Sequence, residues 1–145
     1  MHKQIITDRF LLSRKSTPAT KDDLPSALDL RDTFNYINIQ NINRESECVG
    51  LAANQIGVFK TILVLANEKK KAEIIINPVI IKHSQEMIDS TEGCMSLPGT
   101  QTVKRYPMIK VEYVDEHFKK RTKTFRNIQA LVVQHEMDHF AGKLI

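Results

Sequence analysis

The stretch Gln134-His135-Glu136-Met137-Asp138-His139 decides the fold, and it lies close to the C-terminal end of the sequence. His135 and His139 are four residues apart, so on a helix both imidazoles leave the same face, one turn apart. Glu136 follows the first histidine, and an H-E-x-x-H pattern is typical of a helix that binds a metal ion and carries a general base. Average residue usage would produce this pattern in roughly one of a few hundred chains of this length, so chance is a poor explanation.

An amphipathic helix around this motif is predicted by residues that recur with helical spacing. The stripe consists of Ile128, Leu131, Val132, His135 and His139. Asn127 is predicted to cap the N-terminus of the helix, and Gly142 is predicted to stop it. The alternative is a core helix whose histidines happen to face inward, which would explain a lone histidine better than it explains the whole pattern.

A catalytic zinc-type site needs a third protein ligand and one open position for water. The residues after His139 include no acid, histidine or cysteine, so the third ligand must come from upstream. The candidates are several carboxylates together with His2, His83, His117, Cys48 and Cys94. Cys94 is the best chemical choice, because it is a thiolate ligand in a turn bounded by glycines.

Three motifs in order make the chain resemble the peptide deformylases. They are V-G-L-A-A-N-Q at 49–55, E-G-C-M-S at 92–96 and H-E-M-D-H at 135–139, and they extend from the first expected strand to the last helix. The resemblance implies a metal-dependent hydrolase that removes the N-formyl group from the N-terminal formylmethionine of new polypeptides and releases formate. The partners that it implies are nascent N-formylmethionyl peptides.

The same resemblance implies roles for individual residues. Cys94, His135 and His139 would hold one divalent metal ion, and Glu136 would accept and return the proton. The side-chain amide of Gln55 and the backbone N–H of Met95 would stabilise the oxyanion. Substrate would contact two groups of residues, one from the first two motifs and one from the apolar stripe: Val49, Gly50, Leu51 and Gly93, and Ile128, Leu131 and Val132.

The metal identity follows from the resemblance rather than from the ligands. The resemblance to deformylases implies that Fe²⁺ is the physiological metal, whereas the ligand types alone allow Zn²⁺, Ni²⁺ or Co²⁺. Glu92, Gln134 and Asp138 are suitable partners for orienting the imidazoles, although each could instead be a polar surface residue. Arg105 is expected to pair with one of these acids.

Length and composition favour a single domain over residues 1–145, with 41% hydrophobic residues to build one core. No apolar run approaches 18 residues and no leader is apparent, so we expect a soluble, unsecreted protein. The two cysteines have no paired spacing, which suits a reducing compartment. Together these features predict a cytoplasmic enzyme, with an organelle or the cytoplasm of a virus-infected host as alternatives.

The net charge of +4 favours an anionic partner such as the ribosome, which we expect the protein to contact only transiently. Its basic runs at 69–71 and 119–121 read as solvated turns or strand faces, so no direct nucleic-acid role and no membrane role are expected. We also expect a monomer.

Two hairpins are predicted from short β-branched and apolar runs. The first pairs Thr61–Leu65 with Glu73–Asn77, and Pro78 is expected to end its second strand. The second pairs Ile109–Tyr113 with Phe118–Phe125 and leads into the metal-binding helix.

Helical spacing also predicts an N-terminal helix over Asp22–Asn38, followed by a polar loop over Gln40–Glu47. The fold class is therefore α+β, with antiparallel β-sheets around a central C-terminal metal-binding helix and an additional N-terminal helix. The sequence stops just after the last motif, which indicates a short form without an extra C-terminal helix. Cys48 stands where the family usually has glycine, and it is expected to narrow the groove edge or shift the backbone.

Two other functions fit parts of the pattern. A zinc endopeptidase would share H-E-x-x-H, but the missing downstream ligand argues against it. A non-catalytic peptide binder on the same scaffold is disfavoured, because none of the reacting residues is replaced. Formate release from a formylated peptide, compared with casein cleavage, would separate the three functions.

Overall fold

A computed structural model describes residues 1–40 and 48–145 of the chain. Its main sheet is antiparallel and has the strand order β1-β2-β3-β6-β7. These strands are β1 (Gly50–Ala52), β2 (Ile62–Ala66), β3 (Ala72–His83), β6 (Met108–Val114) and β7 (Lys120–Arg126). Among the described residues, a second sheet pairs β4 (Ile88–Gly93) with β5 (Thr100–Arg105).

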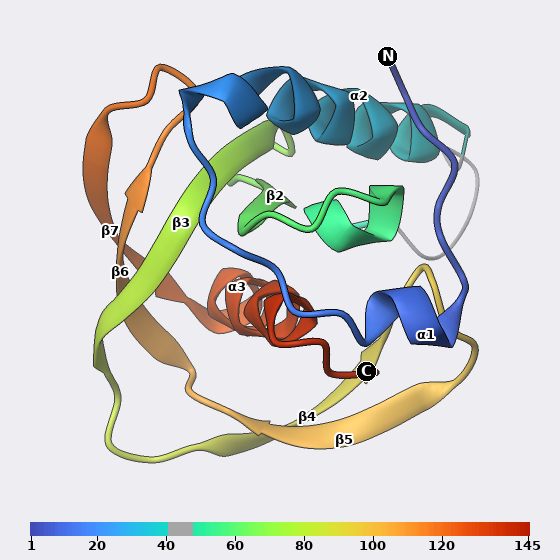
Figure 1. Ribbon diagram of the computed structural model, residues 1–145. Coiled ribbons are helices and arrows are strands. Elements are labelled where there is room, and N and C mark those ends of the chain that lie inside the picture. Colours follow the sequence, from blue (N-terminus) through green and yellow to red (C-terminus); the bar gives the residue numbers. More distant parts are fainter. Residues whose placement is uncertain (41–47) are drawn as a thin grey trace.

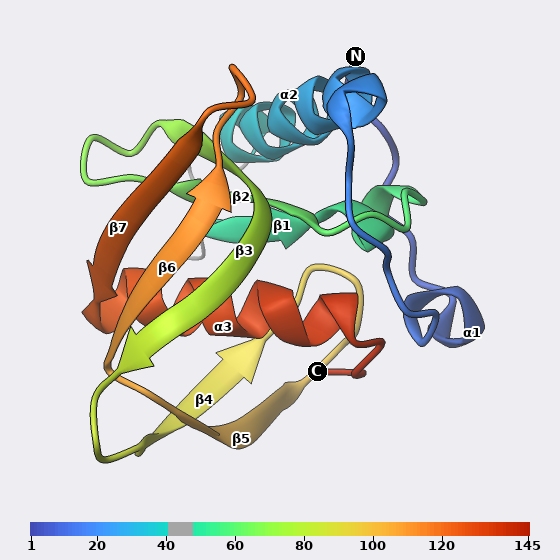
Figure 2. The same ribbon diagram turned by 60° about the vertical axis from the view of Figure 1, so that its left-hand side comes forward.

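Two long helices, α2 (Leu24–Gln40) and α3 (Asn127–Phe140), pack against opposite faces of the main sheet. Short helical turns also occur at α1 (Arg9–Leu12), η1 (Lys21–Asp23) and η2 (Ala53–Ile56). The sheet curves around α3, and the β4–β5 hairpin lies on the other side of that helix (Figures 1 and 2). The described parts of the chain contain no helix long and apolar enough to cross a membrane.

Side-chain alternation along the strands explains why the sheet has a helix on each face. In β2, Ile62 and Val64 pack in the α2 layer with Phe34, while Leu63 and Leu65 pack in the α3 layer. These four side chains are at most 1% exposed. A strand that is buried on both faces reads as a continuous apolar run, which is how the sequence predicted this hairpin.

The first predicted hairpin is present as β2 and β3, but the prediction that Pro78 ends the second strand is wrong. Strand β3 continues to His83, with a shift in its register against β6 between Ile76 and Val79. Asn77 has a positive φ of 51° at this irregularity, and its side-chain amide exchanges hydrogen bonds with the backbone of Ala19. A bulge removes the need for a ladder N–H, so a strand can continue through proline there.

The second predicted hairpin is present as β6 and β7. The β4–β5 hairpin was not predicted, because its residues are mostly polar and show no apolar alternation that would distinguish a strand from a loop. The helix expected over Asp22–Asn38 corresponds to η1 and α2, and α2 extends to Gln40. The rest of the loop expected at Gln40–Glu47 lies outside the described residues.

The two ends of α3 differ from each other in how well they were predicted. Asn127 is not the cap: it is the first helical residue, its φ is +55°, and Arg126 precedes it without a capping side-chain bond. The backbone N–H of Asn127 donates to Pro107 O at 2.9 Å, so tertiary contact sets this end. Gly142 is confirmed as the stop, because it has a φ of +78° and donates to His139 O.

Candidate active site

A cavity of about 600 Å³ opens between β1, the β4–β5 hairpin and α3. It brings together residues from all three sequence motifs. Its walls include Val49, Gly50, Gln55, Gly93, Cys94, Met95, Ile128, Leu131, Val132, His135 and Glu136. Eleven of the thirteen predicted site residues therefore line this cavity. His139 belongs to the donor cluster at the cavity, and Leu51 is the one predicted residue that does neither.

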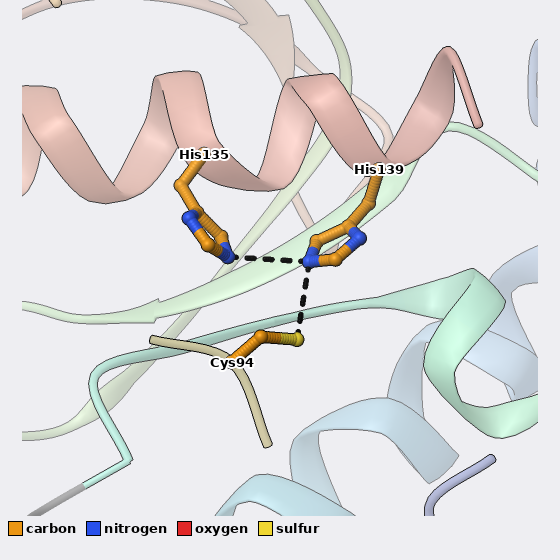
Figure 3. Close-up of side chains that lie close together, drawn as sticks. All are labelled: Cys94, His135 and His139. Atoms are coloured by element: carbon orange, nitrogen blue, oxygen red, sulfur yellow. Dashed lines mark hydrogen bonds between the residues drawn. The ribbon is translucent and has the colours of Figure 1, made fainter. Parts of the chain in front are cut away.

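Three donor atoms converge at the base of this cavity (Figure 3). The Nε2 atoms of His135 and His139 are 3.2 Å apart, and Cys94 Sγ lies 3.5 Å from the second of them. All three ligand atoms lie within 4.8 Å of one another. Two imidazoles and one thiolate with converging lone pairs fit a divalent transition metal and leave a fourth position for water or substrate.

The surroundings of Cys94 favour the thiolate, which is the form that binds metal. Burial alone would raise the pKa of this thiol, but hydrogen bonds from His135 and His139 outweigh it and lower the pKa to about 5. The backbone N–H of Ser96 and the amide Nε2 of Gln55 also donate to Sγ, each at 3.4 Å. These contacts stabilise the thiolate form of Cys94.

Glu92 orients the first histidine, as the sequence suggested. Its carboxylate accepts from His135 Nδ1 at 2.8 Å, from Ser90 Oγ at 2.7 Å and from Arg105 Nη2 at 2.8 Å. These hydrogen bonds outweigh burial and lower the pKa of Glu92 to about 2. The carboxylate therefore stays ionised. Because it accepts from Nδ1, the other ring nitrogen of His135, Nε2, faces the other donors.

Asp138 and Gln134 act differently from the prediction that they orient imidazoles. Asp138 accepts from Arg105 Nη1, which completes a buried Glu92–Arg105–Asp138 network. Gln134 instead exchanges two hydrogen bonds with the backbone of Tyr106, at 2.9 and 2.7 Å. The expected pairing of Arg105 with an acid is confirmed, and it involves two acids.

Replacing Arg105 by leucine should lower the free energy of unfolding by ~3–5 kcal/mol, because it leaves two half-buried carboxylates without their partner. The Arg105 side chain is only 6% exposed. Urea denaturation of the metal-free protein measures the change. The matched control is Lys104→Leu, because Lys104 and its partner Asp89 are both 66% exposed and such a pair contributes ~0–1 kcal/mol. Equal losses in the two variants would contradict the buried role.

Glu136 and Gln55 are two further polar side chains at the donor cluster. Glu136 is 2% exposed, and burial raises the pKa of its carboxyl group. Gln55 is 1% exposed; its Oε1 accepts from Ala52 N at 2.9 Å, which leaves Nε2 pointing toward Cys94 and Ser96. The site thus contains a buried base and a rigid uncharged donor.

Gly50 brings β1 close to α3. A Cβ atom at this position would lie 2.5 Å from Val132 Cγ1 and 3.3 Å from Glu136 Oε2, so only glycine fits without displacement. Val49 is 43% exposed beside it and lines the cavity. The Leu51 side chain does not line the cavity: it is fully buried in the α2 layer, because alternate residues of a strand face opposite sides, so only its backbone is left to meet substrate.

The predicted apolar wall is present along α3. Leu131 and Val132 are half-buried in the cavity wall, whereas Ile128 is 68% exposed at its rim. Met95 is 45% exposed and also lines the cavity. Helical spacing therefore placed these residues on one side of the helix correctly. Only the structure shows that Leu131 and Val132 form the cavity wall while Ile128 lies at its exposed rim.

Several cavity residues were not predicted. They are Ser90, Thr91, Leu97, Pro98 and Gly99, all from β4 or the turn that follows it. Ser96 also contributes, because its hydroxyl accepts from Gln55 Nε2 at 3.1 Å. These residues lie close to Cys94 in the sequence. Predicting the β4–β5 hairpin would have identified them as neighbours of the site.

Cys48 lines the cavity but is not among the converging donors. Its Sγ lies 3.4 Å from Gly50 O, and burial, together with the nearby Glu136 charge, raises the pKa of this thiol to about 12. It therefore stays a neutral thiol and occupies space in the wall, as expected for a side chain in place of glycine.

Comparison with known proteins agrees with this geometry. The family model described as polypeptide deformylase matches residues 6–145. A peptide deformylase of Clostridium beijerinckii is 42% identical over 145 residues, which is all of both chains. The Met-Ala-Ser-bound crystal structure of class I type b peptide deformylase from Acinetobacter baumannii has a TM-score of 0.82 and 27% identity, covering 99% of this chain and 97% of that one.

A crystal structure of a probable peptide deformylase from Synechococcus phage S-SSM7 has a TM-score of 0.78 and 30% identity, with 98% of this chain and 95% of that one covered. The full-length match to the curated relative and the shared fold agree with the three motifs in the cavity. The chain therefore belongs to the polypeptide deformylase family, metal-dependent hydrolases that remove the N-formyl group from new peptides.

Proposed function

We propose that Cys94, His135 and His139 hold the metal ion of this deformylase, and that Glu136, Gln55 and Met95 carry out the reaction beside it. The observation that carries this proposal is the convergence of the three donor atoms within 4.8 Å, with a buried carboxylate next to them. A divalent ion bound there would polarise the formyl oxygen and lower the pKa of a water molecule.

Glu136 is the proton carrier in this mechanism. Its carboxylate takes a proton from the water that attacks the formyl carbon, and it gives a proton to the amine as the C–N bond breaks and formate leaves. Burial raises the pKa of Glu136 above its ordinary value, which brings it closer to that of a base working near neutral pH. Its Oε1 atom lies 3.8 Å from His139 Nε2, beside the donor cluster, which supports this role.

Gln55 and the backbone N–H of Met95 stabilise the negative charge that develops on the former carbonyl oxygen. The Gln55 amide is held by Ala52 N and Ser96 Oγ, so its donor needs little rearrangement during the reaction. Met95 contributes only a backbone group, and its side chain is free to lie in the cavity wall.

The substrate peptide would bind as an extended strand between β1 and β4. Strand β1 is an edge of the main sheet, and β4 has β5 as its one partner in the described residues. Residues of both strands line the cavity, including Gly50 and Gly93. Unpaired strand edges offer backbone donors and acceptors at regular spacing to an added peptide.

We propose that the side chain of the formylated residue rests against Leu131 and Val132. An unbranched thioether adapts to such an apolar wall, whereas a charged side chain would be buried without a partner. We expect a strong preference for formyl-Met over formyl-Glu or formyl-Lys peptides. The preference over formyl-norleucine should be small, because its unbranched side chain has a similar shape, with a methylene in place of the sulfur.

Leu131→Trp should fill this pocket and lower kcat/KM for formyl-Met peptides by roughly 10–200-fold, the range that one pocket contact provides. Leu131 is the better site for this test because there is little room between Val132 and β1: a Cβ at Gly50 would lie 2.5 Å from Val132 Cγ1. Ile128→Trp is the matched control at the exposed rim and should change kcat/KM much less. Bound metal, measured by elemental analysis, should be unchanged in both. A Leu131→Trp enzyme with normal specificity would place the pocket elsewhere.

We further propose that Fe²⁺ is the physiological ion, that residues 1–145 act as one monomeric catalytic domain, and that the enzyme works in the cytoplasm with transient ribosome contact. Family membership supports the metal and the compartment, and an anionic thiol such as Cys94 survives best under reducing conditions. Zn²⁺, Ni²⁺ and Co²⁺ suit the same donors. Anaerobic purification followed by metal analysis and activity per bound ion tests the assignment.

The experiment that tests the proposed function is a formate-release assay on formyl-Met-Ala-Ser beside a casein-cleavage assay. We expect formate release and no casein cleavage. Casein cleavage without formate release would indicate an endopeptidase, and binding of the peptide without either product would indicate a non-catalytic binder.

A further inference from the structure

Three buried side-chain atoms in the described residues have no hydrogen-bond partner: Ser16 Oγ, Asn54 Oδ1 and His139 Nδ1. Asn54 is fully buried and His139 is 1% exposed. Buried polar atoms are almost always hydrogen-bonded, and most of the others in this structure are. Each such atom in a native structure needs an explanation.

All three atoms belong to residues that are anchored at the last turn of α3. The Asn54 amide Nδ2 donates to His139 O at 3.1 Å, and the backbone N–H of Ser16 donates to Phe140 O at 2.9 Å. Asn54 comes from η2, and Ser16 from the segment that follows α1. Three segments far apart in sequence, each with one unpaired buried atom, thus meet at one helix end.

The histidine ring has a defined orientation at this place. Its Nε2 faces Cys94 and His135, while its other nitrogen is turned away from both of them (Figure 3). A ligand nitrogen must be unprotonated, so the ring proton belongs on Nδ1 when Nε2 binds metal. An N–H at that position needs an acceptor, and Asn54 Oδ1 is an acceptor without a donor.

We propose that Asn54 is a positioning residue for His139, acting through one buried water. The water accepts from Nδ1–H, donates to Asn54 Oδ1 and bonds the Ser16 hydroxyl, which satisfies all three atoms at once. A bridge is needed because the atoms do not bond directly. Three polar partners are what a buried water typically has. This inference rests on the proposed role of His139 as a metal ligand.

The consequence is that the two histidines are oriented by different means. His135 is held directly by the carboxylate of Glu92 at 2.8 Å, whereas His139 is held by a neutral amide through water. A carboxylate raises the basicity of an imidazole ligand more than an amide does. Asn54 therefore fixes the tautomer and direction of the ring without adding a negative charge on the Nδ1 side of His139.

The proposal is tested by titrating the metal-free protein with Co²⁺ and measuring its affinity for this ion. Asn54→Leu removes both the donor and the acceptor and should weaken the affinity by about 10–100-fold, the usual effect of removing such a partner. Asn54→Asp keeps an acceptor but loses the donor to His139 O, so its affinity should stay at or above that of the wild type. Ser16→Ala should weaken affinity less than Asn54→Leu does.

A purely structural role would give a different pattern. If Asn54 serves only to hold the helix end through His139 O, then the leucine and aspartate variants lose affinity equally, which would overturn the proposal. Asn77→Leu is the matched control, because this amide holds the Ala19 backbone and should affect urea stability but not Co²⁺ affinity. A drop in affinity in the control as well would equally refute a specific role.

A spectroscopic measurement keeps the test informative if the leucine variant folds poorly. In Zn²⁺-loaded protein, the His139 Nδ1 proton should be visible by ¹⁵N-correlated NMR and protected from exchange, and Ser16→Ala should speed its exchange. An Nε2–H tautomer would contradict the inference. Wild-type protein that binds Co²⁺ no better than Cys94→Ala would instead contradict the metal site itself, so the two failures are distinguishable.

Discussion

Glu136→Ala should reduce deformylation by about 10⁴-fold or more while leaving the bound metal stoichiometric. The expected loss is at or beyond the upper end of general acid–base catalysis, because Glu136 handles the proton in both the attack and the departure of the amine. The carboxylate is 2% exposed and lines the cavity beside the donor cluster, and it is not one of the converging ligands. Steady-state kinetics with elemental analysis of the same sample measure both quantities.

The matched control for this variant is Asp138→Asn. Asp138 is an acid two residues further along the same helix, but its carboxylate accepts from Arg105 rather than facing the cavity. We expect a loss of stability and at most about a tenfold change in turnover per folded molecule, because an indirect partner affects only ligand orientation. Near-normal activity of Glu136→Ala would show that another group carries the proton.

The pH profile of kcat/KM should report the same carboxylate. Burial raises the pKa of Glu136, and a base works only when it is deprotonated. Activity should therefore fall as the pH decreases through a pKa above the ordinary glutamate value, and it should be retained above that pKa. The residual activity of Glu136→Ala should lack this acidic limb. An identical limb in the variant would assign it to a different group.

Cys94→Ala should abolish metal binding, and with it all metal-dependent activity. The side chain supplies the anionic donor of the cluster, and without it only two neutral imidazoles remain, one fewer than the three ligands of ordinary catalytic sites. Its low pKa of about 5 means that the thiolate is available across the neutral range. Cobalt-substituted protein gives a direct measurement, since a thiolate ligand produces a charge-transfer band that the variant should lose.

Cys48→Ala is the control for this prediction. Cys48 also lines the cavity, but the pKa of its thiol is raised to about 12 and its sulfur lies against Gly50 O. Metal content and the cobalt band should therefore be unchanged. A band that persists in Cys94→Ala and disappears in Cys48→Ala would reverse the ligand assignment.

The sequence alone was sufficient for features that arise from local spacing. The i, i+4 histidines and the apolar stripe through Leu131 and Val132 placed the metal-binding helix, because helical geometry puts such residues on one face whatever surrounds them. The apolar runs of β2 and β6 likewise predicted their hairpins. Cys94 was found by chemistry, as the upstream thiol in a turn bounded by glycines.

Other features depended on the partners that folding brings together. The β4–β5 hairpin is mostly polar, so its sequence lacked the alternation that marks a strand. Leu51 lies in a motif of the site, yet strand geometry turns its side chain into the core. Asn127 looked like a cap, but the hydrogen bond from its backbone to Pro107 O sets the helix start instead.

What only the tertiary structure decided is how each ligand is held. Glu92, Arg105 and Asp138 come from two strands and a helix, and Asn54 meets His139 across 85 positions of sequence. No local pattern encodes such pairs, because their distances depend on the packing of the sheet and the hairpin around α3. The sequence thus indicated which atoms we propose to bind the metal and perform the chemistry, while burial and hydrogen bonding in the folded protein decide their charges and directions.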